Sequence, residues 1–127
     1  MGNGTSIGRV RGLGSAKTGV HHWLVQRFTA VGNLLLVLWL AVSLVLLPDL
    51  GYASVTDWLA TPVPAVAMIL LIVSTFWHAR LGMQVMIEDY VHEHGSKFAC
   101  LVALNFAAFG GAAFGAFCVI RLALGAH

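Results

Sequence analysis

The sequence is short of charge. Lys, Arg, Asp and Glu together make up only 9% of the 127 residues, whereas apolar residues make up 59%. Soluble domains usually carry about 25% charged residues. A soluble domain of this length could not bury so much hydrocarbon, because small domains bury a smaller fraction of their surface. A soluble globular fold is therefore excluded, and we expect lipid to surround most of the chain.

Basic residues and cysteines are also too few for two other classes of protein. The net charge is only +2 and the basic residues form no clustered face, which argues against a nucleic-acid partner. The two cysteines, Cys100 and Cys118, lie inside one apolar run, so we expect no disulfide framework and interpret them as small packing residues. Repeats of the kind that mark transporter halves are absent as well.

Proline is rare, and it separates the long apolar runs. Pro48 ends the first run, whereas Pro62 and Pro64 open the second, where the missing proline N–H costs nothing. We therefore predict an all-α membrane protein of three transmembrane helices that packs with a second three-helix subunit. Each helix is long enough to cross a hydrocarbon core of about 30 Å. The predicted spans are residues 23–47, 64–91 and 97–124.

The segments between the predicted spans are polar. Residues 49–61 carry Tyr52 and Trp58, which suit an interfacial position, and residues 92–96 are expected to form a polar turn. The domain organisation follows: residues 1–21 form an N-terminal segment, and residues 22–127 form the transmembrane domain.

The distribution of Lys and Arg predicts the orientation of the chain. Basic residues gather before the first helix and at the second loop, whereas the first loop has none. Cytoplasmic loops of membrane proteins carry an excess of Lys and Arg. We therefore expect the N-terminus and the second loop on the cytoplasmic side. The basic residues outside the middle of the predicted spans are Arg9, Arg11, Lys17, Arg27, Lys97 and Arg121.

Polar residues inside a span are costly, and the second predicted helix has most of them. His78 lies close to its middle, and Gly82, Val85 and Asp89 each fall within about 40° of His78 on a helical wheel. A neutral imidazole with a glycine one turn away suits a haem iron and its flat macrocycle. A histidine that hydrogen-bonds a neighbouring helix is the other interpretation, and the spacing does not separate the two.

Three further residues of the second helix have two interpretations each. Arg80 lies about 200° from His78, so it can pair with Glu88, Gln84 or an anion such as a haem propionate. Tyr90 can anchor the helix at the interface or donate a hydrogen bond to a quinone carbonyl. The neighbouring Asp89 can be solvated or tune that phenol.

The other two helices indicate packing. His22, Gln26, Thr29 and Asn33 form one polar stripe on the first helix. Helix-to-helix hydrogen bonding can explain the last three. Arg27, a turn into that span, requires an anion or carbonyl partner. In the third helix the sequence G-x-x-x-G, at residues 111–115, permits close helix approach, and we interpret this helix as packing only.

Two segments together resemble a known family. His78-Ala79-x-x-Gly82 is followed after six residues by Asp89-Tyr90-Val91, and Gly19-Val20-His21 is followed by Arg27-x-Thr29-Ala30. This pattern resembles the small hydrophobic membrane-anchor subunits of succinate dehydrogenase (respiratory complex II), of the cytochrome b or D type. Arg80 and Gln84 stand where some members carry large aromatic residues.

The resemblance implies a function in electron transfer, without an active site in this chain. His78 would be one axial ligand of haem b, the second coming from a larger cytochrome b anchor subunit. Arg27, His21, Arg80 and Gly82 would surround the haem, while Tyr90 and Asp89 would contact ubiquinone. Iron–sulfur and flavoprotein subunits would oxidise succinate and deliver the electrons.

Of two rival functions, only the second remains open at this point. A self-contained b-type cytochrome would need a second histidine at mid-depth, which the sequence lacks. A non-redox transmembrane scaffold or small transporter component would place His78 and Arg80 in one polar network. The bacterial inner membrane is the expected location, and the mitochondrial inner membrane is the alternative.

Overall fold

The computed structural model describes residues 19–125, which form four α-helices. They are α2 (Gly19–Leu46), α3 (Tyr52–Leu59), α4 (Pro62–Tyr90) and α5 (His94–Ala123). Three of them, α2, α4 and α5, are long and apolar enough to cross a membrane. The predicted all-α class and the three spans are confirmed. Most of the expected N-terminal segment 1–21 lies outside the described residues.

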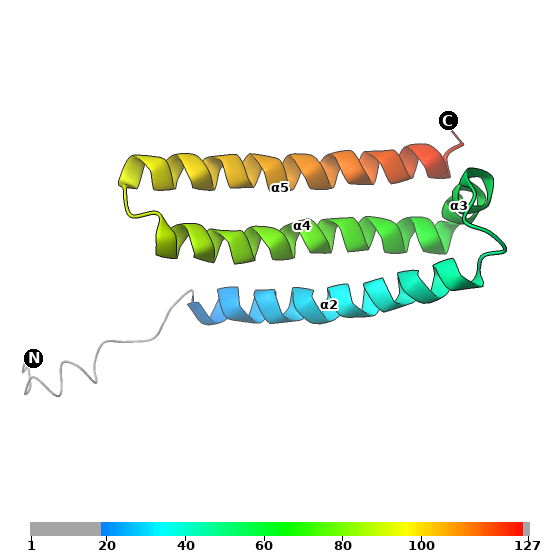
Figure 1. Ribbon diagram of the computed structural model, residues 1–127, viewed down its shortest axis with the longest axis horizontal. Helices are drawn as coiled ribbons and strands as arrows, with labels where there is room; N and C mark the ends of the chain where they lie inside the picture. Colours follow the sequence, from blue (N-terminus) through cyan, green and yellow to red (C-terminus); the bar gives the residue numbers. More distant parts are fainter. Residues whose placement is uncertain (1–18, 126–127) are drawn as a thin grey trace, which may run out of the picture.

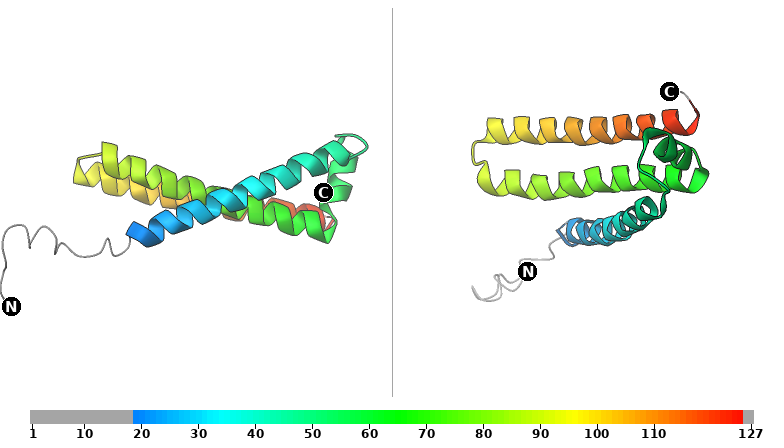
Figure 2. Two further views of the ribbon diagram at one scale, coloured as in Figure 1. Left: turned by 90° about the horizontal axis from the view of Figure 1, so that it is seen from below. Right: turned by 45° about the vertical axis from the view of Figure 1, so that its right-hand side comes forward.

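The three long helices lie side by side, with α4 between α2 and α5 (Figure 1). In the view from below, α2 crosses the α4–α5 pair at an angle (Figure 2). The start of α2 and the α4–α5 turn share one end of the bundle, as the basic residues predicted. Which end faces the cytoplasm stays a prediction.

Helix α5 begins three residues before its predicted start at residue 97, because a glutamate caps it. The Glu93 carboxylate accepts hydrogen bonds from the backbone N–H of Gly95 at 2.8 Å and of Ser96 at 2.5 Å. These groups are the first helix donors, which have no intrahelical partner. Hydrogen bonds from Ser96 and Gly95 hold the pKa of Glu93 below its ordinary value. Part of the predicted polar turn 92–96 is therefore the first turn of α5.

The segment between the first two spans contains a helix that the sequence did not predict, α3. Its entry is held by Asp49, whose carboxylate accepts hydrogen bonds from the Gly51 N–H at 2.6 Å and the Ser54 hydroxyl at 2.8 Å. Trp58 of α3 stacks on Trp39 of α2, with ring centroids 5.7 Å apart. The helix thus closes one end of the bundle (Figure 1).

Helices α4 and α5 form the closest pair. A Cβ built at Gly111 would collide with the Phe76 ring, and one built at Gly115 would lie 2.9 Å from Ile72 Cγ2. Neither position could take a Cβ at an ordinary contact distance, so the two helices pack at a separation that requires glycine at both. The predicted packing role of the G-x-x-x-G sequence is confirmed. Cys100 and Cys118, both in α5, are free thiols.

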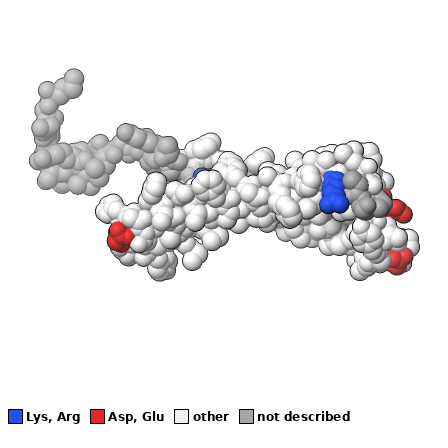
Figure 3. Space-filling model, turned by 90° about the horizontal axis from the view of Figure 1, so that it is seen from above, with Lys and Arg blue, Asp and Glu red and all other residues white. Residues whose placement is uncertain are grey.

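The outer surface is apolar. No polar or charged residue among residues 19–125 is buried as a whole, whereas large apolar side chains such as Phe28 and Val45 are 83% exposed. On the face drawn in Figure 3, acidic atoms lie at the two ends and the middle is almost entirely uncharged. Helix α2 has no buried residue at all, and it packs against α4 alone among the long helices. This surface suits lipid and other membrane helices.

Candidate functional site

His78 contacts a residue of the first span. Its ring nitrogen Nδ1 lies 3.0 Å from the Thr29 hydroxyl of α2, and both side chains are half-buried. The same hydroxyl lies 2.9 Å from the Val25 carbonyl and 3.0 Å from the Gln26 carbonyl of its own helix. His78 therefore joins α4 to α2. Its partner, Thr29, belongs to the polar stripe that was predicted on the first helix.

Two of the remaining residues of that stripe have unsatisfied groups. Gln26 Oε1 and Asn33 Oδ1 are buried and have no hydrogen-bond partner among residues 19–125. A Cβ added at Gly82, one turn after His78, would meet Gln26 Nε2 at 3.6 Å, which is an ordinary contact. Helix-to-helix hydrogen bonding is thus confirmed for Thr29 but not for these two oxygens. We call Gln26, Thr29, Asn33, His78 and Gly82 the α2–α4 seam.

A groove of about 530 Å³ opens between the start of α2 and the later turns of α4. His21, one of the predicted site residues, lines it. Gln84 and Glu88, also in its wall, are joined by a hydrogen bond of 2.8 Å between Gln84 Nε2 and Glu88 Oε1. The complete lining is Gly19, His21, His22, Val25, Trp77, Leu81, Gln84, Val85 and Glu88.

Arg80 points toward α5, away from the seam. Its Nε donates a hydrogen bond of 2.5 Å to Asn105 Oδ1, and its guanidinium lies 5.4 Å from the Trp77 ring and 5.6 Å from the Phe109 ring. The structure shows this bond to Asn105 in place of the predicted pairing with Glu88 or Gln84, which are joined to each other. The geometry also gives no support for Arg80 beside a haem at His78.

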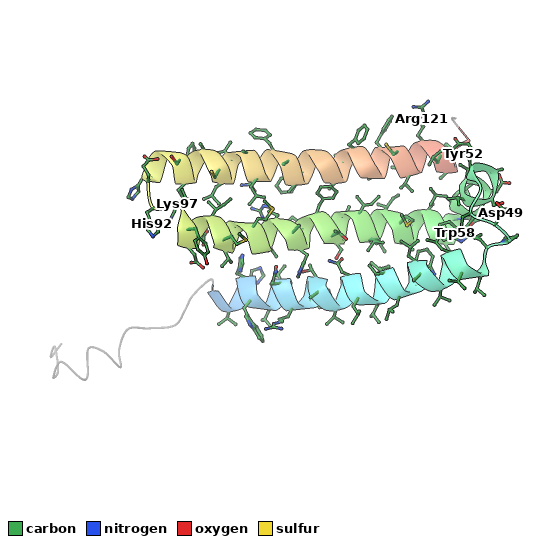
Figure 4. The ribbon with its side chains drawn as sticks, in the orientation of Figure 1. Asp49, Tyr52, Trp58, His92, Lys97 and Arg121 are labelled. Carbon is green, nitrogen blue, oxygen red and sulfur yellow. The ribbon has the colours of Figure 1, made fainter. Side chains whose placement is uncertain are left out.

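The other predicted residues lie apart from His78. The Arg27 guanidinium stacks 5.5 Å from the Trp23 ring on an exposed face of α2. Tyr90, the last residue of α4, is 78% exposed, and Asp89 beside it is also exposed. Neither lines the groove, although both lie at the same end of the bundle. His92 and Lys97 lie at this end, and Asp49, Tyr52 and Arg121 lie at the other (Figure 4).

Two side-chain contacts between helices could not be predicted from the sequence. Asn105 was hidden in a helix interpreted as packing only, and a lone amide within a long apolar run was the available signal. The contact between Thr29 and His78 had no signal beyond a polar stripe and a histidine on two separate helices.

The described residues do not form a complete metal site. Among residues 19–125, no group of three or more His, Cys, Asp or Glu side chains is arranged to hold a metal ion. A metal ion at His78 would need its other ligands from a cofactor or from another chain.

Comparison with known proteins identifies the family. The family of succinate dehydrogenase/fumarate reductase transmembrane subunits matches residues 1–112. The succinate dehydrogenase hydrophobic membrane anchor subunit of Rickettsia bellii (strain RML369-C) is 38% identical over 100 residues, which cover 78% of this chain and 79% of that protein. The subunit of the same description from Rickettsia conorii is 37% identical over equal shares, and that from Rickettsia felis is 31% identical over 84% of this chain and 80% of that protein. The chain therefore belongs to the family of succinate dehydrogenase/fumarate reductase transmembrane subunits.

Proposed function

We propose that this chain anchors a succinate dehydrogenase in the bacterial inner membrane, supplies one axial ligand of a haem b and forms part of a ubiquinone site. The family membership and the three membrane spans support the anchor. Flavoprotein and iron–sulfur subunits would oxidise succinate and pass electrons to the quinone at the membrane surface. The chain itself makes and breaks no bond of the substrate.

The geometry of His78 is the observation that carries the haem proposal. Its Nδ1 has a hydrogen-bond partner on α2, so Nε2 is the nitrogen left for a metal. Histidines that bind metals usually hold their second ring nitrogen in such a hydrogen bond. A haem between two histidines accepts and releases single electrons when it is bound. The second histidine would come from the larger cytochrome b anchor subunit.

The residues around His78 suit this cofactor in part. Gly82 lies one turn away and adds no side chain, and its own packing against Gln26 does not require a glycine. His21 in the groove and the exposed Arg27 are available to the propionates of a haem. Arg80 is occupied by Asn105 and the two aromatic rings, so we assign it to α4–α5 packing.

The rival scaffold function loses its main support. It placed His78 and Arg80 in one polar network, yet the two side chains bond to different helices, through Thr29 of α2 and Asn105 of α5.

The anchor function predicts where succinate oxidation is found after cell fractionation. In cells that lack this chain but express the other subunits, we expect dye-coupled succinate oxidation to move from the membrane to the soluble fraction. Quinone reduction should be lost, because electrons no longer reach the bilayer. Expression of the wild-type chain should restore both. Membrane-bound, quinone-active enzyme in the absence of this chain would contradict the proposal.

The quinone site predicts a selective effect of Tyr90→Phe. Tyr90 is open to a ligand at the end of α4, and we propose that its phenol donates a hydrogen bond to the quinone carbonyl, with Asp89 beside it. A hydrogen bond of this kind is worth about 0.5–1.5 kcal/mol, so quinone reduction should fall by a factor of about 2 to 10.

The measurement compares quinone reduction with dye-coupled succinate oxidation in the same membranes, and only the first should fall. Tyr52→Phe is the matched control, because Tyr52 is 70% exposed but lies at the opposite end of the bundle (Figure 4). Equal quinone reduction in Tyr90→Phe and wild type would remove Tyr90 from the site.

A further inference from the structure

We propose that Thr29 is a positioning residue for His78: its hydroxyl accepts a hydrogen bond from Nδ1–H and leaves Nε2 unprotonated as the donor atom for the haem iron. This inference rests on the proposed haem ligation. The three hydrogen-bond distances at the Thr29 hydroxyl carry it.

The direction of the hydrogen bond follows from a count of protons. A threonine hydroxyl has one proton, and a backbone carbonyl can only accept. Thr29 Oγ1 lies 2.9 Å from the Val25 carbonyl and 3.0 Å from the Gln26 carbonyl, so its proton points back into its own helix. The threonine then has no proton left to donate in its 3.0 Å contact with His78 Nδ1. We infer that the histidine supplies the proton, which corresponds to the Nδ1–H tautomer.

The unsatisfied groups of the seam act in the same direction. The two buried atoms there that lack partners, Gln26 Oε1 and Asn33 Oδ1, are both acceptors. Among residues 19–125 no buried side-chain donor lacks a partner, so no buried unpaired donor of the seam competes to give Nδ1 a proton. The opposite tautomer, with the proton on Nε2, would leave that nitrogen unable to bind iron.

The proposal has a consequence for the redox potential. A hydrogen bond from Nδ1–H to an acceptor raises the basicity of the ligating nitrogen and holds the ring in one orientation. A more basic ligand stabilises the oxidised iron. Removal of the acceptor should therefore shift the midpoint potential of the haem to a more positive value and weaken retention of the haem.

The test is a potentiometric titration of haem b in the purified complex, with its electron paramagnetic resonance spectrum as a second readout. Thr29→Val keeps the shape of the side chain but removes the hydroxyl, and we expect a positive shift of the potential together with altered g-values. Thr29→Ser keeps the hydroxyl and should restore both. Thr56→Val is the matched control, because the Thr56 hydroxyl makes the same two backbone hydrogen bonds, at 2.8 Å and 2.9 Å, in α3.

Each outcome decides between the two proposals. An unchanged potential and spectrum in Thr29→Val, with haem retained, would overturn the role of Thr29 and leave the proposed function standing. Loss of haem in Thr29→Val with rescue by Thr29→Ser would support the role. Equal loss in both variants would contradict it, since the serine keeps the hydroxyl. A wild-type complex without haem would overturn the haem part of the proposed function and this inference with it.

Discussion

Membranes that carry the complete complex with His78→Ala are expected to lose, or strongly shift, the b-type absorbance in a reduced-minus-oxidised spectrum. The substitution removes the imidazole that we propose as an axial ligand, and no other histidine lies in the described part of α4 or α5 at its depth. Loss of the hydrogen-bond partner of a metal ligand alone costs about 10–100-fold in affinity. Loss of the ligand itself should cost more than about 100-fold by the same measure.

His92→Ala is the matched control for this spectrum. His92 is exposed in the turn between α4 and α5 and does not line the groove, so its removal should leave the absorbance unchanged (Figure 4). An unchanged spectrum in His78→Ala would remove this residue as a ligand. Absence of the signal in wild type and mutant alike would leave only the anchor and the quinone site.

Gly111→Ala should destabilise the helix bundle, whereas Gly110→Ala should not. Both changes replace glycine by alanine inside α5, and both gain about 1 kcal/mol of helix propensity. Only at Gly111 does the new Cβ collide with Phe76; nothing lies within 4 Å of a Cβ at Gly110. Overpacking of this kind costs about 1–3 kcal/mol. We therefore expect Gly111→Ala to be about 1–3 kcal/mol less stable than Gly110→Ala.

The difference can be measured from the unfolding midpoint of the purified complex in detergent, followed by the loss of α-helical circular dichroism. Because the neighbouring glycines share the same helix, effects of the detergent and of propensity cancel in the comparison. Equal midpoints for the two variants would show that Phe76 moves aside at no cost. Gly111 would then not determine the distance between α4 and α5.

The three spans could be predicted because lipid leaves the backbone little choice. A chain that crosses the hydrocarbon core must satisfy its N–H and C=O groups internally, so a long apolar run becomes a helix. The short α3 has no such constraint. Its eight residues mix Tyr, Thr, Asp and Trp, and their folding depends on the Asp49 hydrogen bonds and the Trp39–Trp58 stack, which are tertiary.

The sequence indicated which residues belong to the candidate site, but it did not indicate which side chains they contact. A helical wheel indicated that His78 and Arg80 point to different sides, and the structure confirms this with partners on α2 and α5. Which side chains they meet depends on how the helices cross and on their relative height, which one sequence does not contain. The pairing of His78 with Thr29 and that of Arg80 with Asn105 therefore emerged only from the fold.

The absence of any buried residue in α2 bears on how the protein is made. Helix α2 leaves the ribosome before its packing partner exists, and one hydrogen bond, between Thr29 and His78, later joins it to α4. Each span can insert as an independent helix before helices associate laterally in the bilayer. The α4–α5 hairpin, with its close glycine contact, is therefore expected to form the stable assembly intermediate, to which α2 docks last. A newly inserted α2 would be the part of the chain most exposed to quality-control proteases until that docking takes place.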